Sequence, residues 1–235
     1  MNKSLHDILV LVISLKSEDH RRLKVYEQLD STKFLFVNAI NGKTNKNMGN
    51  KFVIPPIDAI WNSHKKAYKQ FLSTNKSYCL ILEDDFVILN QDAMWQKIKI
   101  LTRFKPDLVQ LGWLQTGMDI RIQRIYEGFT YLLFRIFNQV FGDFQQYANK
   151  LRPSRASALP SLVIPDSFLP GAHGYLISRK FAAAVLELNN PTFLSADDFL
   201  ISISRMRSFN SMRLRKSLIG QQGTSRVGSE RFIRS

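Results

Sequence analysis

The chain has 235 residues, of which 45% are hydrophobic; this composition is typical of a folded globular protein and excludes an intrinsically disordered chain. Its 33 lysines and arginines outnumber its 19 acidic residues, so the formal net charge is +14. This charge favours polyanionic partners (nucleic acid, anionic lipid or phosphorylated substrates) without choosing among them. The single cysteine excludes an internal disulfide, and no segment approaches the roughly 20 apolar residues that span a bilayer.

The chain predicts strands that alternate with helices. Residues 8–13 form a continuous, mostly β-branched apolar run, which is typical of a strand buried on both faces. A helix over 18–29 and a strand over 34–37 complete a βαβ unit. The later elements expected are a helix over 57–72, a strand over 77–82, a helix over 92–104, strands over 107–112 and 171–178, a helix over 179–188 and a final helix from Ala196. This alternation predicts an α/β fold with a mostly parallel sheet flanked by helices.

Residues 120–151 show a different pattern. Apolar and aromatic side chains recur there at helical spacing, with arginines on the rest of the helical wheel. The stripe is typical either of a helix that covers a core or of one that lies on a membrane surface, and both interpretations stay open. We therefore expect one domain over 1–235, with 115–165 as a long amphipathic helical insertion or lid region within it.

The most informative motif is the apolar run Leu80–Leu82 followed by three consecutive acids, Glu83, Asp84 and Asp85. Adjacent carboxylates repel one another, and a cation at the C-terminal end of the strand relieves that repulsion. Mg²⁺ and Mn²⁺ prefer oxygen ligands and often join a carboxylate to substrate phosphates. Ligands of open α/β sheets bind beyond the carboxyl ends of the strands. The motif predicts a metal–diphosphate site; the alternative is a solvated acidic turn between two strands.

Six short segments follow one another along the chain in a characteristic order. They are Val12–Leu15 with Arg21 and Arg22, Asn38–Gly42, Ser63-His64 ahead of Glu83–Asp85, Gly171–Ser178, Ala196–Asp198, and Ile219–Gly223 with Ser225. In this order and spacing they resemble glycosyltransferase family 25, the bacterial lipooligosaccharide galactosyltransferase group. The resemblance spans most of the chain. It departs from the family at Ile60–Asn62, where a Gly-Cys pair is common, and 115–165 matches no pattern of the family.

The resemblance implies a GT-A-like fold, a nucleotide-sugar donor and a divalent cofactor, Mn²⁺ or Mg²⁺. Asp85 is then the first candidate for the metal ligand, and His173 or His64 is a further candidate. The donor-binding candidates, all within segments shared with the family, are Ser14, Arg21, Asn41, Glu83 and Asp84. A metal at this position would neutralise the charge of a leaving diphosphate.

An inverting transfer also needs a general base that deprotonates the acceptor hydroxyl. Asp197 and Asp198 are the candidates, because they follow the strand over 171–178 at the place that the family pattern predicts. Two acids at the start of a helix also suit a purely structural role as a cap and a partner of the helix dipole. The sequence does not separate the two residues.

We therefore expect an inverting, metal-dependent glycosyltransferase that moves a hexose, with galactose from UDP-galactose as the favoured donor, onto a lipopolysaccharide, lipooligosaccharide or other surface glycan. A nucleotidyltransferase is the rival enzyme, but it predicts a glycine-rich or basic triphosphate loop after the first strand, and Ser14–Ser17 is not glycine-rich. A nucleic-acid-binding protein would carry aromatic residues interleaved with basic ones on a sheet, or a recognisable module, and neither appears outside the stripe over 121–151. We expect a cytoplasmic protein, with peripheral association with the inner membrane as a further hypothesis.

Overall fold

The computed structural model describes residues 7–30, 32–44, 53–113, 162–165, 168–206 and 208–222. The amphipathic stripe over 120–151 and nearly all of the expected insertion over 115–165 lie outside these residues. The expectations of a long helical insertion and of one domain over 1–235 therefore stay predictions.

The described elements follow one another as the sequence predicts, with a few additions. They are β1 (Ile8–Ser14), α1 (Asp19–Gln28), β2 (Leu35–Asn38), α2 (Pro55–Leu72), β3 (Tyr78–Glu83), β4 (Phe86–Ile88), α3 (Gln91–Thr102), β5 (Leu108–Gln110), β6 (Val163–Pro165), β7 (Gly174–Ser178), α6 (Arg179–Val185), α7 (Ala196–Ser204), β8 (Ser211–Leu214) and β9 (Ile219–Gln221). The helix α2 begins at Pro55, because a proline suits the first turn of a helix, where its missing N–H costs no hydrogen bond.

The main sheet has seven strands in the order β2-β1-β3-β7-β5-β8-β6. The strands β2, β1, β3, β5 and β8 run in one direction, whereas β7 and β6 run antiparallel to their neighbours. This confirms the α/β class and the mostly parallel sheet. A second sheet pairs β4 with β9 in antiparallel register, so that Phe86 lies opposite Gln221.

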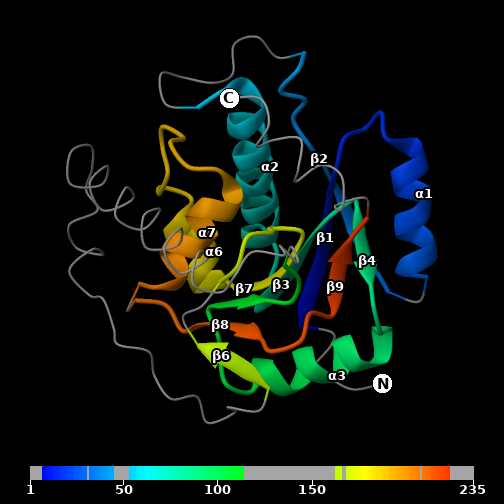
Figure 1. Ribbon diagram of the computed structural model, residues 1–235, viewed down its shortest axis with the longest axis vertical. Coiled ribbons are helices and arrows are strands. Elements are labelled where there is room, and N and C mark those ends of the chain that lie inside the picture. The colour runs from blue at the N-terminus through cyan, green and yellow to red at the C-terminus, as the bar shows by residue number, and fades with distance from the viewer. Residues whose placement is uncertain are drawn as a thin grey trace, which may run out of the picture.

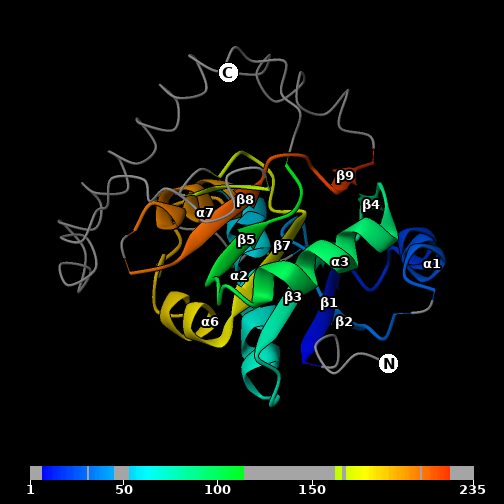
Figure 2. The ribbon, with the colours of Figure 1, turned by 90° about the horizontal axis from the view of Figure 1, so that it is seen from below.

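Helices cover both faces of the main sheet (Figure 1). The helices α2, α6 and α7 bury one face, and α1 and α3 bury the other, as the second view also shows (Figure 2). Side chains along β1 alternate between the two cores: Leu11 and Ile13 pack towards α2, whereas Val10 and Val12 pack towards α1 and α3. A strand buried on both faces requires apolar residues at every position, which is why β1 reads as an unbroken apolar run.

The strand expected over 171–178 begins only at Gly174. Gly171 has φ of 123°, a backbone conformation that L side chains rarely adopt, so 171–173 forms a loop ahead of β7. The short strands β6, β8 and β9 were not predicted, because three or four residues carry too little periodicity to be recognised.

Candidate active site

The carboxyl ends of β1, β2 and β3 meet at one edge of the main sheet, because the three strands are parallel. Ser14 pairs with Asn38, and Ile13 pairs with Glu83. Antiparallel β7 starts at the same edge, where the Glu83 N–H donates to the carbonyl of His173 at 3.2 Å. The acidic triplet and His173, which are far apart in the sequence, therefore lie together where α/β sheets usually bind ligands.

Arg22 fills the part of this edge that belongs to β1 and β2. Its guanidinium donates to the Ser14 hydroxyl and the Ser14 carbonyl, both at 3.3 Å, and to the side chain of Asn38 at 2.7 Å. The guanidinium also stacks on Phe36, with Cζ 4.5 Å from the ring centroid. Ser14 itself is buried. Its predicted donor-binding hydroxyl is therefore already used within the protein.

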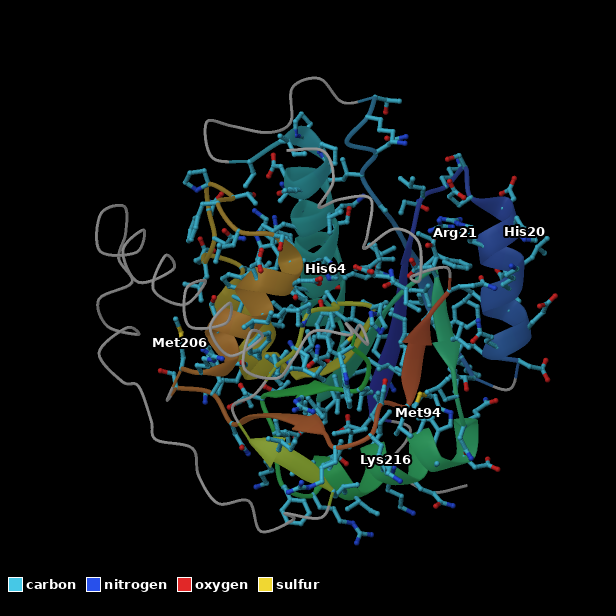
Figure 3. The ribbon with its side chains drawn as sticks, in the orientation of Figure 1. His20, Arg21, His64, Met94, Met206 and Lys216 are labelled. Carbon is cyan, nitrogen blue, oxygen red and sulfur yellow. The ribbon has the colours of Figure 1, made fainter. Side chains whose placement is uncertain are left out.

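Arg21 points instead to the acidic turn. Its guanidinium donates to Asp84 Oδ1 at 3.0 Å and lies 3.7 Å from Glu18. Arg21 on α1 and His64 on α2 come from opposite faces of the sheet (Figure 3). Two of the predicted donor-binding residues, Arg21 and Asp84, are thus held together by an ion pair in which Arg21 is half-exposed and the Asp84 side chain is mostly buried.

Asp85 is the most constrained member of the triplet. Its Oδ2 accepts a hydrogen bond from the Gln221 side chain at 2.7 Å, and its carbonyl accepts one from the Gln222 N–H at 2.7 Å. Its Oδ1 is buried and has no hydrogen-bond partner among the described residues. Burial, and next the negative charge of Glu83, raise the pKa of Asp85 to about 6. A buried carboxylate oxygen without a donor is one that a cation would stabilise.

Glu83 is tied to the buried core on the α2 face. His64 Nε2 lies 3.3 Å from Glu83 Oε1, and His64 Nδ1 lies 2.6 Å from the Tyr175 hydroxyl. The Tyr175 hydroxyl is in turn 2.8 Å from the hydroxyl of Tyr68. Because both ring nitrogens of His64 already have protein partners, His64 does not suit the role of a metal ligand.

His173 is buried, and neither of its ring nitrogens makes a hydrogen bond of good geometry to a described residue. Burial lowers the pKa of His173, and Glu83 and the Ile219 carbonyl act in the opposite direction. A Cβ at Gly112 would lie 2.8 Å from His173 Nε2, so only glycine leaves room for the ring there. A buried imidazole whose lowered pKa favours the neutral form suits the role of a ligand, and this role remains a prediction.

The structure separates Asp197 from Asp198. Asp198 Oδ2 accepts from the Ser195 hydroxyl at 2.7 Å. The Asp198 N–H in turn donates to Ser195 Oγ at 3.2 Å, so that Ser195 caps α7 and Asp198 holds the capping hydroxyl. Asp197 lies one position earlier in the first turn. Burial raises its pKa to about 7, as do the charges of Glu83 and Asp198, while the backbone of Ala172 and Gly171 lowers it.

Asn41 lies in the turn after β2, where its side chain accepts from the Lys43 N–H at 2.9 Å. The neighbouring Ile40 N–H donates to the Ser63 hydroxyl at 2.9 Å, which connects this turn to α2 beside His64. The role of Asn41 in donor binding remains a prediction.

Comparison with known proteins identifies the chain. The profile of glycosyltransferase family 25, described as LPS biosynthesis proteins, matches residues 8–200. The chain belongs to glycosyltransferase family 25. The enzyme therefore uses a sugar donor and an acceptor. No curated protein matches it.

Among solved structures, this family 25 enzyme is similar to A197 from STIV at 12% identity and a TM-score of 0.45, over 90% of this chain and 82% of the other. It is also similar to a glycosyltransferase involved in the glycosylation of the major capsid of PBCV-1, at 10% identity and a TM-score of 0.43, over 96% of this chain and 98% of the other. No helix within the described residues is long and apolar enough to cross a membrane.

The described residues of the enzyme contain no group of three His, Cys, Asp or Glu side chains arranged to hold a metal ion. The buried Oδ1 of Asp85 still suits a cation that takes most of its ligands from a substrate and from water, as Mg²⁺ does when it binds through one or two carboxylates and phosphates. The donor set at this edge thus fits a hard divalent cation that arrives with a diphosphate.

Three residues of this edge were not predicted as site residues. Tyr175 supports His64, Gln221 binds Asp85, and Gln110 holds the loop ahead of His173 through the carbonyls of Leu169 and Gly171 at 2.6 and 3.0 Å. Tyr175 stands within the family's strand motif, which was the signal available for it. Gln221 likewise stands within the family's closing segment, whereas no motif marks Gln110.

Proposed function

We propose that this enzyme transfers a hexose with inversion from a nucleotide-sugar donor, UDP-galactose being the favoured one, onto a lipopolysaccharide, lipooligosaccharide or other surface glycan. The observation that carries the proposal is that two acids at one sheet edge, Asp85 and Asp197, have different environments. Asp85 has a buried oxygen with no hydrogen-bond partner among the described residues, and the Asp197 carboxyl is buried beside the backbone of Gly171 and Ala172, with its pKa raised to about 7. Asp85 is suited to bind a cation beside the leaving diphosphate, and Asp197 is suited to accept the proton of the attacking hydroxyl.

At the donor side, Asp85 would hold Mn²⁺ or Mg²⁺, with His173 as the further ligand. When bound, the cation would supply positive charge to the diphosphate as it leaves. Arg21, fixed by Asp84 at 3.0 Å, adds a second positive charge at the same edge. Glu83 lies at the carboxyl end of β3 and suits a hydroxyl group of the nucleotide or sugar.

At the acceptor side, we assign the base to Asp197. Its carboxylate takes the proton of the acceptor hydroxyl while the hydroxyl oxygen attacks the anomeric carbon. The bond from that carbon to the diphosphate oxygen breaks, and its electron pair leaves with the nucleoside diphosphate. A pKa near the working pH is the favourable value for such a base. Asp198 is less suited, because its carboxylate accepts a hydrogen bond from the Ser195 hydroxyl that caps α7.

A glycolipid acceptor lies at a membrane surface, and the net charge of +14 favours contact with anionic headgroups. Peripheral association with the inner membrane from the cytoplasmic side is therefore part of the proposal. The stripe over 120–151 belongs to the same hypothesis.

A donor screen tests the proposal. The purified enzyme, with Mn²⁺ or Mg²⁺ and with EDTA as control, is incubated with UDP-galactose, UDP-glucose, UDP-N-acetylhexosamines and GDP-mannose, and released nucleoside diphosphate is measured. We expect metal-dependent release that is largest with UDP-galactose. Nuclear magnetic resonance of the product would give the anomeric configuration. Release that persists in EDTA would contradict the metal, and a retained configuration would contradict inversion.

A further inference from the structure

The buried hydrogen-bond chain behind Glu83 has a direction. A tyrosine hydroxyl carries one proton, an ionised carboxylate only accepts, and a neutral imidazole donates from one nitrogen and accepts at the other. Because His64 Nε2 faces Glu83 Oε1, this nitrogen carries the proton and His64 Nδ1 accepts from Tyr175. The Tyr175 hydroxyl then accepts from Tyr68. Every proton in the chain thus points towards Glu83.

The opposite direction is unfavourable. A proton on His64 Nδ1 would point at the Tyr175 hydroxyl and would leave the Nε2 lone pair facing the Glu83 carboxylate, which repels it. The tautomer is therefore assigned from the network. Burial raises the pKa of both the Tyr68 and the Tyr175 hydroxyl, which keeps both protonated as donors.

The chain is built from rigid, buried parts. His64, Tyr68 and Tyr175 are at most 1% exposed. The rings of His64 and Tyr175 are stacked, with centroids 5.8 Å apart and planes at 28°. The Glu83 side chain, in contrast, is 27% exposed and has three rotatable bonds. The contact with His64 restricts the rotamers of this carboxylate, which reaches the site.

Glu83 is also the acid with the widest electrostatic influence at this edge. Its negative charge raises the pKa of Asp85, of His173 and of Asp197. A displaced Glu83 carboxylate would therefore disturb both the donor side and the acceptor side of the site.

We propose that Tyr175 and His64 are positioning residues that hold the Glu83 carboxylate as a fixed hydrogen-bond acceptor for a hydroxyl group of the donor, and that Tyr68 supports them from behind. This inference rests on the proposed use of a nucleotide sugar. Neither tyrosine touches the donor; both act through His64 and Glu83. The hydroxyl belongs either to the ribose or to the transferred sugar, and the ligands used in the test distinguish the two.

The first test compares three Tyr→Phe variants, each of which removes one oxygen and keeps the ring. Tyr175→Phe removes the donor to His64, so we expect the Kd for UDP-galactose and the KM to rise by about tenfold while kcat changes less. Tyr68→Phe leaves that donor in place, so its effect should stay below about threefold. Tyr78→Phe lies at the far end of β3 and should match the wild type. Equal losses in Tyr175→Phe and Tyr68→Phe would overturn the proposal.

The second test changes His64. The amide nitrogen of glutamine reaches the position of Nε2, whereas that of asparagine reaches only the position of Nδ1. We expect His64→Gln to keep most of the donor affinity and His64→Asn to lose it. Titrations with UDP and with 2′-deoxy-UDP assign the hydroxyl: if it is the ribose 2′-hydroxyl, wild type prefers UDP and Tyr175→Phe does not. If UDP binds both proteins equally while UDP-galactose does not, the hydroxyl belongs to the sugar.

A third measurement is independent of glycosyl transfer. Nitrogen-15 spectra of the imidazole rings, with the His64 signals assigned by their loss in His64→Gln, should show the proton on Nε2 in the wild type. A proton on Nδ1 would overturn the direction of the chain. A wild-type protein that binds no nucleotide sugar would contradict the proposed function itself, whereas normal donor binding in a folded Tyr175→Phe would contradict the positioning role alone.

Discussion

The ends of β1 and β3 lie side by side, yet their polar side chains are used differently. At β1, Arg22 occupies the Ser14 hydroxyl, the Ser14 carbonyl and Asn38, so that these groups are all satisfied within the protein. At β3, Asp85 keeps a buried oxygen without a described partner, and its pKa is raised to about 6. Polar side chains of the family motifs therefore have two roles at this sheet edge. Ser14 and Asn38 form hydrogen bonds that stabilise the protein, whereas Asp85 is suited to bind a ligand.

The largest expected effect separates the two acids at the start of α7. Asp197→Asn should lower turnover by roughly 10²- to 10⁴-fold, the usual contribution of a general base, while donor binding with metal is retained. Asp198→Asn should instead remove a negative charge from the first turn of α7 and weaken the acceptor of the Ser195 hydroxyl, which costs roughly 0.3–1 kcal/mol of unfolding free energy with a smaller loss of turnover. Steady-state kinetics, donor titration and melting curves of both variants make the comparison. Near-normal turnover in both would place the base elsewhere.

The second effect concerns Asp85, which follows the carboxyl end of β3 and has a buried oxygen without a described partner. Asp85→Asn removes the charged oxygen that suits a cation and should reduce turnover by at least about 100-fold. The protein should fold at least as well as wild type, because the variant relieves repulsion from Glu83. The control is Asp84→Asn, which removes the charge paired with the half-exposed Arg21 and should cost less activity. A fully active Asp85→Asn enzyme would contradict the assignment of this end of the sheet.

The third effect concerns Arg22, which forms hydrogen bonds with the polar groups at the carboxyl ends of β1 and β2. Arg22→Ala should lower the free energy of unfolding by about 2 kcal/mol, because Ser14 and Asn38 lose hydrogen bonds to a charged group. Arg22→Lys should recover only part of it, since an ammonium cannot reproduce the guanidinium fork. Denaturant unfolding measures the loss. Activity per folded molecule should fall less than in Asp85→Asn; a greater loss would mean that Arg22 contacts the substrate.

A further expected effect is a pH dependence of stability at Asp197. Its pKa is about 7 when folded, whereas an aspartate in an unfolded chain titrates near 4. Between these values the folded state holds a proton that the unfolded state releases, so stability falls as pH rises. Asp197→Asn should therefore raise the melting temperature at about pH 8 and change it little at about pH 4. Equal shifts at both pH values would contradict the raised pKa.

The sequence determined the elements that local pattern specifies. The apolar run of β1 and the periodicity of α2 predicted their places closely, because burial on two faces or on one stripe leaves a pattern in consecutive residues. The acidic triplet at the end of β3 and the family membership also followed from the order of motifs along the chain. The antiparallel strand β7 was expected, but its direction was not, because direction depends on which strand it pairs with.

Only the tertiary structure decided how each acid is used. In the sequence, Asp197 and Asp198 are adjacent and equivalent, and Asp84 and Asp85 differ only in the roles that the family resemblance implies. The fold gives Asp198 to the Ser195 cap and Asp84 to Arg21, and it desolvates Asp197 and Asp85. It also brings Tyr175 of β7 against His64 of α2, 111 residues apart in the chain. The properties of a carboxylate depend on neighbours that approach from other elements, and the linear order of residues does not record those approaches.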